Sequence, residues 1–189
     1  MRVHVLETAR LRLAPFRAGE AGELHRLWTE PPVRRFLWDG RVIPPEQTAG
    51  IVRDSLRLFA ADGFGLWSLR LRDGGELAGF GGFWHFRDPP ERELLLGLAE
   101  AWWGQGLAAE AGRALVRFAF EELGFDAVRG STDAPNRASV RVMEKLGMEF
   151  ERRETIDGLD TVFYAVRRDG WRPDGAEYRV RAIALPDLD

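Results

Sequence analysis

The stretch EAWWGQGLAAEA, from Glu100 to Ala111, constrains the fold most, because it puts two glycines between an apolar segment and an alanine-rich segment. The apolar run Arg92–Leu98 predicts a strand buried on both faces. Behind Gly104 the spacing predicts a helix over 104–123 that buries Ala108, Ala111, Leu115 and Phe118. A strand, a glycine turn and a helix in this order present free backbone N–H groups at the helix N-terminus, which favour an anion. The glycines leave room for a diphosphate to reach them.

The same turn is open to three other interpretations. The first is a purely structural connection between strand and helix. A P-loop is excluded, because it needs Gly-Lys-Ser/Thr and the single lysine, Lys145, lies elsewhere. A dinucleotide fingerprint of an oxidoreductase is matched by Gly104, Gly106 and Ala109. However, such a fingerprint requires an acidic residue at the end of the next strand, whereas Asp126 lies at the start of that strand.

The composition limits the kind of protein. A chain of 189 residues with 45% hydrophobic residues predicts a single core, and a net charge of -3 gives no global attraction to nucleic acid or an anionic membrane. Without cysteine there is no disulfide or thiolate metal site. The three histidines have no metal-ligand spacing, so we expect no metal. No apolar run is long enough to span a membrane, and we expect a cytoplasmic location.

The hydrophobic patterns predict an α+β fold around one mostly antiparallel sheet. Besides the strand and helix above, the predicted strands are 9–16, 64–71, 77–86, 126–133, 151–156 and 160–168, and the predicted helices are 19–28, 44–61 and 136–146. We expect one domain over 1–171. The extension over 172–189 is rich in Pro, Asp and Arg, and we expect it to be irregular or to lie over the surface.

A second motif, NRASVRVMEKLGM, spans Asn136 to Met148. Asn136 follows a proline and is a natural N-cap. Ser139 lies at helical spacing on the same face as Val142, Met143 and Leu146, where an apolar residue is expected. A small serine tolerated on a packed face is the structural alternative to a functional hydroxyl.

Together, WWGQGLAAEA and NRASVRVMEKLGM resemble the GNAT superfamily of acetyl-CoA-dependent N-acetyltransferases, in particular its RimJ/RimL branch. The resemblance covers roughly residues 6–167 and includes TARLRLAPF and VRRFLWDG. It implies a sheet splayed between the fourth and fifth predicted strands, 92–98 and 126–133, with acetyl-CoA in the gap. The implied cofactor-binding residues are Leu96, Leu98, Ala99, Trp103, Gly104, Gln105, Gly106, Leu107, Ala108, Asn136, Ser139 and Lys145. Lys145 could equally be a solvated helix-end cation.

The resemblance also implies direct transfer of the acetyl group to an amine, which needs a base, an oxyanion donor and a proton for the thiolate. An N–H near Leu98 fits the oxyanion role. Glu93 is the preferred base and Glu154 the second candidate, although either could be a surface carboxylate or be replaced by a water chain. Many members carry Tyr where this chain has Met143, which shifts the acid role to Ser139 or to solvent.

The acceptor pocket is expected to be aromatic, although core packing explains such residues equally well. Its candidates are Phe36, Trp38, Trp67, Trp84, His85 and Phe86. The acceptor is a protein N-terminus or a small-molecule amine, which the sequence does not separate. A non-catalytic acyl-CoA sensor of the same fold is the alternative function. An exposed sheet edge or the tail after Trp171 could support a homodimer.

Overall fold

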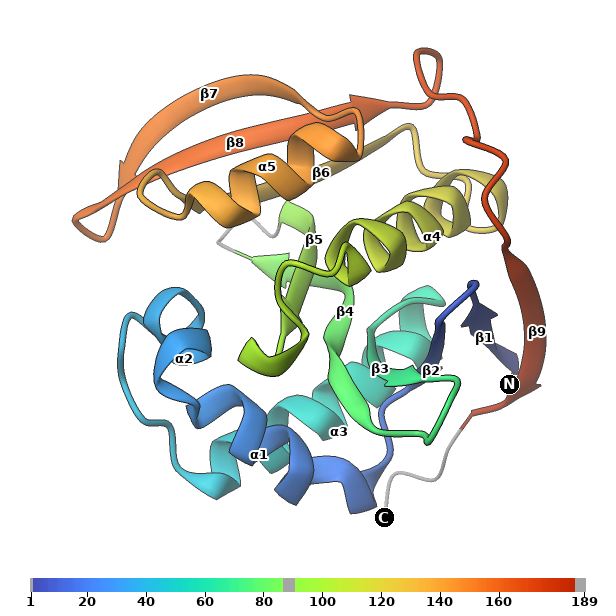
Figure 1. The fold of residues 1–189 in the computed structure, drawn as a ribbon, viewed down its shortest axis with the longest axis horizontal. Helices are drawn as coiled ribbons and strands as arrows, with labels where there is room; N and C mark the ends of the chain where they lie inside the picture. The colour runs from blue at the N-terminus through green and yellow to red at the C-terminus, as the bar shows by residue number, and fades with distance from the viewer. Residues whose placement is uncertain (1, 87–90, 186–189) are drawn as a thin grey trace.

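The computed structural model describes residues 2–86 and 91–185, which form two antiparallel sheets and five α-helices (Figure 1). The large sheet has the order β5-β4-β3-β2-β1-β9, and the small sheet has the order β6-β8-β7. The strands are β1 Arg2–Glu7, β2 Leu11–Pro15, β3 Leu66–Leu71, β4 Leu77–Phe86, β5 Glu91–Leu98, β6 Ala127–Asp133, β7 Glu149–Ile156, β8 Leu159–Arg167 and β9 Arg179–Ala184. The predicted α+β class is confirmed.

The helices divide the core into two clusters on opposite faces of the large sheet. They are α1 Ala21–Thr29, α2 Pro31–Leu37, α3 Pro45–Asp62, α4 Leu107–Glu121 and α5 Arg137–Lys145. One cluster joins α1, α2 and α3 to Leu66 and Phe80. The other joins α4 and α5 to Trp67 and to the small sheet. Since successive strand residues point to opposite faces, Leu66 and Trp67 mark the two sides.

The predicted split of the sheet is confirmed, and it lies between β5 and β6, the fourth and fifth strands expected from the sequence. These strands are neighbours but belong to different sheets. Near the start of β5 they are joined by Ser131, whose hydroxyl donates to Glu93 at 2.6 Å. The prediction that β5 is buried on both faces is wrong, because Leu94 to Gly97 are only half-buried. As the last strand of the large sheet, β5 faces the gap with one edge.

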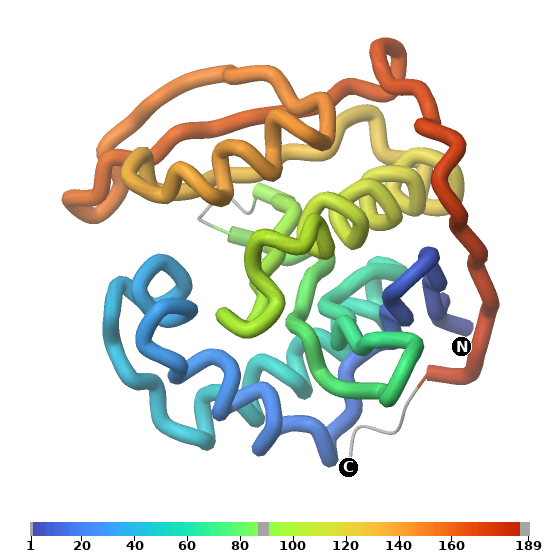
Figure 2. The backbone as a smooth tube through the Cα atoms, in the orientation of Figure 1, coloured from blue at the N-terminus to red at the C-terminus, as the bar shows by residue number. Residues whose placement is uncertain are grey.

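The tail after Trp171 departs from the prediction. Residues 172–178 form an irregular segment, but β9 then pairs with β1 along its length, from Arg2 opposite Ala184 to Glu7 opposite Arg179. The red segment in Figure 2 runs from the small sheet past α4 to this edge. Asp174 ties it to Arg113 on α4 at 3.1 Å. The tail is therefore part of the fold, and the sequence pattern missed both β9 and its partner β1.

Other boundaries differ modestly from the predictions. Helix α2 was not predicted, and α4 begins at Leu107, three residues after the predicted start. The final hairpin is confirmed around Asp157 and Gly158, both with positive φ. Within the described residues, no helix is both long and apolar enough to cross a bilayer.

Candidate functional site

The glycine turn lies between β5 and α4 and owes its shape to two left-handed residues. Gly104 has φ 74° and Gly106, the N-cap of α4, has φ 81°. L-residues with a side chain rarely adopt this conformation, which explains why α4 starts only at Leu107. A Cβ at Gly104 would meet nothing within 4 Å. The glycines are thus required by backbone conformation, and the room that they leave for a diphosphate stays a prediction.

Trp103 fastens this turn to β5. Its indole Nε1 donates to the carbonyl of Leu98 at 2.9 Å, while 48% of the residue stays exposed. Gln105 adds a side-chain bond to the carbonyl of Ala101 at 3.1 Å. Trp102, half-buried, packs against the main core. The bulky pair thus anchors the turn from the strand side.

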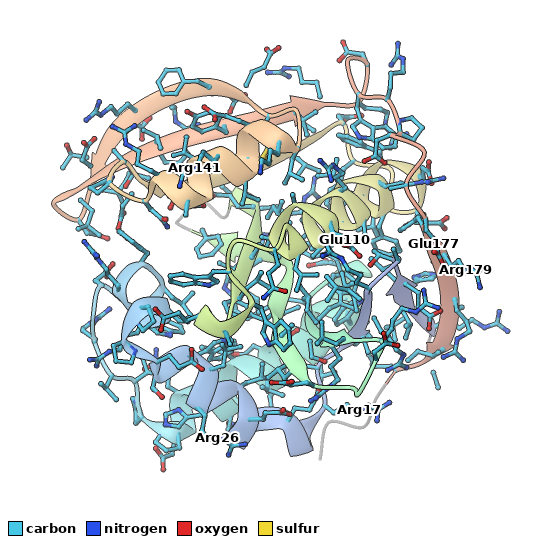
Figure 3. The ribbon with its side chains drawn as sticks, viewed as in Figure 1. Arg17, Arg26, Glu110, Arg141, Glu177 and Arg179 are labelled. Carbon is cyan, nitrogen blue, oxygen red and sulfur yellow. The ribbon has the colours of Figure 1, made fainter. Side chains whose placement is uncertain are left out.

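A polar network holds the turn from the other side. Glu110, in the first turn of α4, accepts from the Thr8 hydroxyl at 2.6 Å and from the Arg10 amide at 2.9 Å. The Arg10 guanidinium contacts the same carboxylate at 2.6 Å and donates to the Gln105 carbonyl at 3.0 Å. Burial would raise the pKa of Glu110, but the hydrogen bonds from Thr8 and Arg10 outweigh burial and lower it. Figure 3 labels Glu110 on α4.

The outer edge of β5 is oriented toward the gap. The amide of Ala99 donates to Ala78 on β4 at 3.0 Å, and the register pairs Gly97 with Phe80. Because hydrogen-bonding direction alternates along an antiparallel strand, the backbone groups of Leu96 and Leu98 point away from β4. Leu96 and Leu98, on this edge, are among the residues that the resemblance implies for acetyl-CoA.

Helix α5 brings the second motif beside the same gap. Asn136 is confirmed as N-cap, since its side chain accepts from the amide of Ser139 at 3.3 Å and donates to the Thr132 hydroxyl at 3.0 Å. The oxygen and the nitrogen of the Asn136 side chain therefore both have hydrogen-bond partners within the protein. Ser139 is half-buried in the first turn. Lys145 is the last residue of α5 and lines a hollow of about 270 Å³ between α4, α5 and the tail.

The two candidate bases lie on one face of the small sheet. A Cβ at Gly130 would point toward Met143 of α5, so Ser131 and its partner Glu93 face the opposite way. Glu93 is only 2% exposed. Glu154 is exposed and accepts from Arg152 at 2.7 Å. Ser139 stands on the α5 side, so hydroxyl and carboxylates approach β6 from different sides.

Asp133, the last residue of β6, was not predicted as a site residue. It shares the face of Ser131, and no described residue donates a hydrogen bond to its carboxylate. Burial raises the pKa of Asp133, and the charges of Asp39 and Asp160 raise it further. A carboxylate at the end of a strand, just before Pro135, was the available sequence signal. Arg10 and Thr8 were also missed, because their partner is about 100 residues away in the chain.

The aromatic candidates do not form one pocket. Trp67 is fully buried and donates to the His4 carbonyl at 2.8 Å, so its assignment to an acceptor pocket is wrong. Trp84 and His85 line a groove of about 330 Å³ beside α3. Phe36 and Trp38 lie instead on and just after α2, where Trp38 packs against Trp28 with ring centroids 6.0 Å apart. Phe86 is the half-buried last residue of β4.

Known proteins are similar to this chain in sequence and in fold. A curated relative, the FsC-acetyl coenzyme A-N(2)-transacetylase of Aspergillus fumigatus, is 29% identical over 88% of this chain and 77% of its own. An acetyltransferase structure from Agrobacterium tumefaciens is 27% identical with TM-score 0.76, over 86% of this chain and 94% of the other. The ribosomal L7/L12 α-N-protein acetyltransferase RimL, in complex with coenzyme A, shares the fold at 20% identity with TM-score 0.74, over 87% and 98%.

The family comparison covers the turn, α4 and α5. The model of the acetyltransferase (GNAT) domain matches residues 10–149, which include the glycine turn and the second motif. The sheet split between β5 and β6 and the turn before α4 lie within this match. The chain therefore belongs to the GNAT acetyltransferase family.

Proposed function

We propose that this protein transfers an acetyl group from acetyl-CoA to a primary amine by direct attack in a ternary complex. The observation that carries the proposal is the turn at Gly104 and Gly106, whose left-handed glycines precede the N-terminus of α4 beside the outer edge of β5. Helix N-termini of this kind favour a diphosphate, and an open strand edge can pair with an extended amide-bearing arm. Family membership supports the same assignment.

The chain supplies a group for each chemical need. Glu93 accepts the proton of the acceptor ammonium, and the resulting amine attacks the thioester carbonyl carbon. An amide at the β5 edge, at Leu98, donates to the oxyanion. When the carbon–sulfur bond breaks, the Ser139 hydroxyl gives its proton to the leaving thiolate and takes up the second proton that the attacking nitrogen loses, so the hydroxyl is restored. Glu154 is the second choice as base, because its carboxylate is exposed and already paired with Arg152 at 2.7 Å.

The acceptor belongs on the face that carries Glu93, Ser131 and Asp133. Burial and the two neighbouring carboxylates, Asp39 and Asp160, raise the pKa of Asp133, so a cationic group is favoured there. An ammonium group has that charge, whether it belongs to a protein N-terminus or to a small molecule. The Aspergillus relative is named for transfer to an N(2) amine and RimL for a protein N-terminus. Both acceptor classes are therefore primary choices for screening.

The experiment combines coenzyme binding with a thiol-release assay. Acetyl-CoA is expected to raise the melting temperature, and a panel of amines and N-terminal peptides is expected to release free CoA at a rate that depends on the amine. Binding without release for any amine would favour a non-catalytic acyl-CoA sensor. A shift with nicotinamide dinucleotides and none with acetyl-CoA would overturn the proposal.

Ser139→Ala tests the acid role. Its kcat is expected to fall about tenfold while the Kd of acetyl-CoA stays within about twofold, since one proton donor is lost and the coenzyme contacts remain. Ala138→Ser, one residue away and exposed, is the matched control. Unchanged kinetics in the Ser139 variant would remove this hydroxyl from the mechanism.

A further inference from the structure

The turn that is proposed to receive a diphosphate has a carboxylate beside it. Glu110 lies in the first turn of α4, four residues after Gly106, and its side chain is only 16% exposed. Carboxylates are stabilised at a helix N-terminus, but for the same reason they compete with an anionic ligand for the positive end of the helix. An unneutralised Glu110 would therefore weaken any phosphate site at this turn.

Arg10 is placed to cancel that charge. Its Nε and Nη2 lie 2.7 and 2.6 Å from Oε2 of Glu110, which is a charge-assisted pair. The same guanidinium donates from Nη1 to the carbonyl of Gln105 at 3.0 Å, inside the turn. Arg10, which lies almost 100 residues earlier in the chain, thus contacts both the glycine turn and the first helical turn of α4.

The guanidinium is also open to ligands. Nη2 lies 3.7 Å from the position that a Cβ would take at Gly106, so it is the group that a side chain there would first meet. About half of the Arg10 side chain, 49%, is exposed, in contrast to its partner. Thr8 adds a neutral donor to Glu110 and no charge. The positive member of the pair therefore faces solvent at the turn, while the negative member is covered.

We propose that Arg10 is the charge-setting residue of the coenzyme turn, neutralising Glu110 and presenting its exposed guanidinium to the phosphates of the coenzyme. This inference rests on the proposed function, because it assumes that acetyl-CoA binds at Gly104 to Ala108. It predicts opposite effects for the two members of one ion pair. A purely mechanical clamp would give both members the same effect.

The experiment measures CoA binding by calorimetry for Arg10→Met, Glu110→Gln and the double variant. Arg10→Met is expected to raise Kd about tenfold, which corresponds to ~1.4 kcal/mol. Glu110→Gln keeps an acceptor for Thr8 and is expected to bind as tightly as the wild type or more tightly. The double variant is expected to return to within about threefold of the wild type, because the unpaired carboxylate is gone.

Two further readouts separate charge from structure. Arg10→Lys keeps the positive charge and is expected to stay within about threefold of the wild type. The Kd of Arg10→Met should depend less on ionic strength, since salt screens a charge that this variant lacks. The matched controls are Arg117→Met and Glu121→Gln, an exposed pair 2.9 Å apart on the same helix, which are expected to leave Kd within about twofold.

The outcomes distinguish the two proposals. If Arg10→Met and Glu110→Gln both weaken CoA binding, with no recovery in the double variant, the inference about Arg10 is overturned while the proposed function stands. If neither changes Kd, Arg10 has no role in coenzyme binding. If the wild type binds no CoA, both proposals are overturned together.

Discussion

Two carboxylates on either side of the gap differ in how far the protein itself satisfies them. Glu110, on the proposed coenzyme side, accepts from Thr8 and Arg10, and its pKa is lowered. Asp133, on the proposed acceptor side, receives no hydrogen bond from any described residue, and its pKa is raised. Groups of the protein itself therefore satisfy the carboxylate of Glu110 without a ligand. Asp133 has a charge that a cationic acceptor would satisfy, so the two halves of the site are organised differently.

The largest expected effect comes from the buried base of the acceptor side. Glu93→Gln keeps the shape and can still accept from Ser131, but it cannot take a proton. We expect kcat to fall about a hundredfold with the Kd of acetyl-CoA unchanged. Steady-state kinetics of thiol release measure this, with Glu154→Gln as the matched control, which is expected to lose no more than about threefold. A larger loss in the Glu154 variant would exchange the roles of the two carboxylates.

The second effect concerns stability on the coenzyme side. The folded-state pKa of Glu110 is lowered, so its contribution is fully present above the unfolded value near 4.5 and is lost as the pH falls through the folded value. Glu110→Gln is expected to lower the free energy of unfolding at pH 7 by about 1 to 2 kcal/mol. Denaturant titrations should show this deficit shrinking below about pH 4. A deficit that does not depend on pH would mean that the charge of Glu110 is not what stabilises the fold.

A pair of glycine variants tests whether the turn matters beyond backbone strain. Gly106→Ala and Gly158→Ala both put a side chain at positive φ, 81° and 82°, with no close contact at either site. Each should lower the free energy of unfolding by about 1 kcal/mol. Only Gly106→Ala should also weaken CoA binding, by about tenfold, as measured by calorimetry. Equal affinities for the two variants would separate the turn from the coenzyme.

The smallest effect is expected at Asp133. A raised pKa means that the folded state disfavours the ionised carboxylate, so stability falls as the pH rises through this pKa and the cost persists at neutral pH. Asp133→Asn should therefore raise the free energy of unfolding at pH 7 by less than about 1 kcal/mol after solvent screening. The gain should vanish below about pH 3, where the group is protonated in both states. A loss of stability at pH 7 would show that Asp133 has a structural partner.

Features that depend on neighbouring residues could be predicted from the sequence, and features that join distant segments could not. The turn at Gly104 and Gly106 and the N-cap Asn136 depend on local patterns and were predicted correctly, whereas the split at β5 was implied by the resemblance to the GNAT superfamily. Arg10 and Asp133 were missed because their roles depend on segments far apart in the chain. Strands β1 and β9 were missed for a similar reason, since β9 is exposed or half-buried along its length and is a strand because it pairs with β1. Trp67 was misassigned because sequence does not distinguish an aromatic of the core from one of a pocket.

We propose that acetyl-CoA binds along the β5 edge and the glycine turn, on a site that is formed before the ligand arrives. Amide chemical shifts recorded by NMR during a CoA titration test it most directly. The account predicts that the largest shifts fall at Leu96, Leu98 and Gly104 to Ala108, with little change in the rest of α4. Saturable binding with its largest shifts elsewhere, for example around Trp84 and His85, would contradict it.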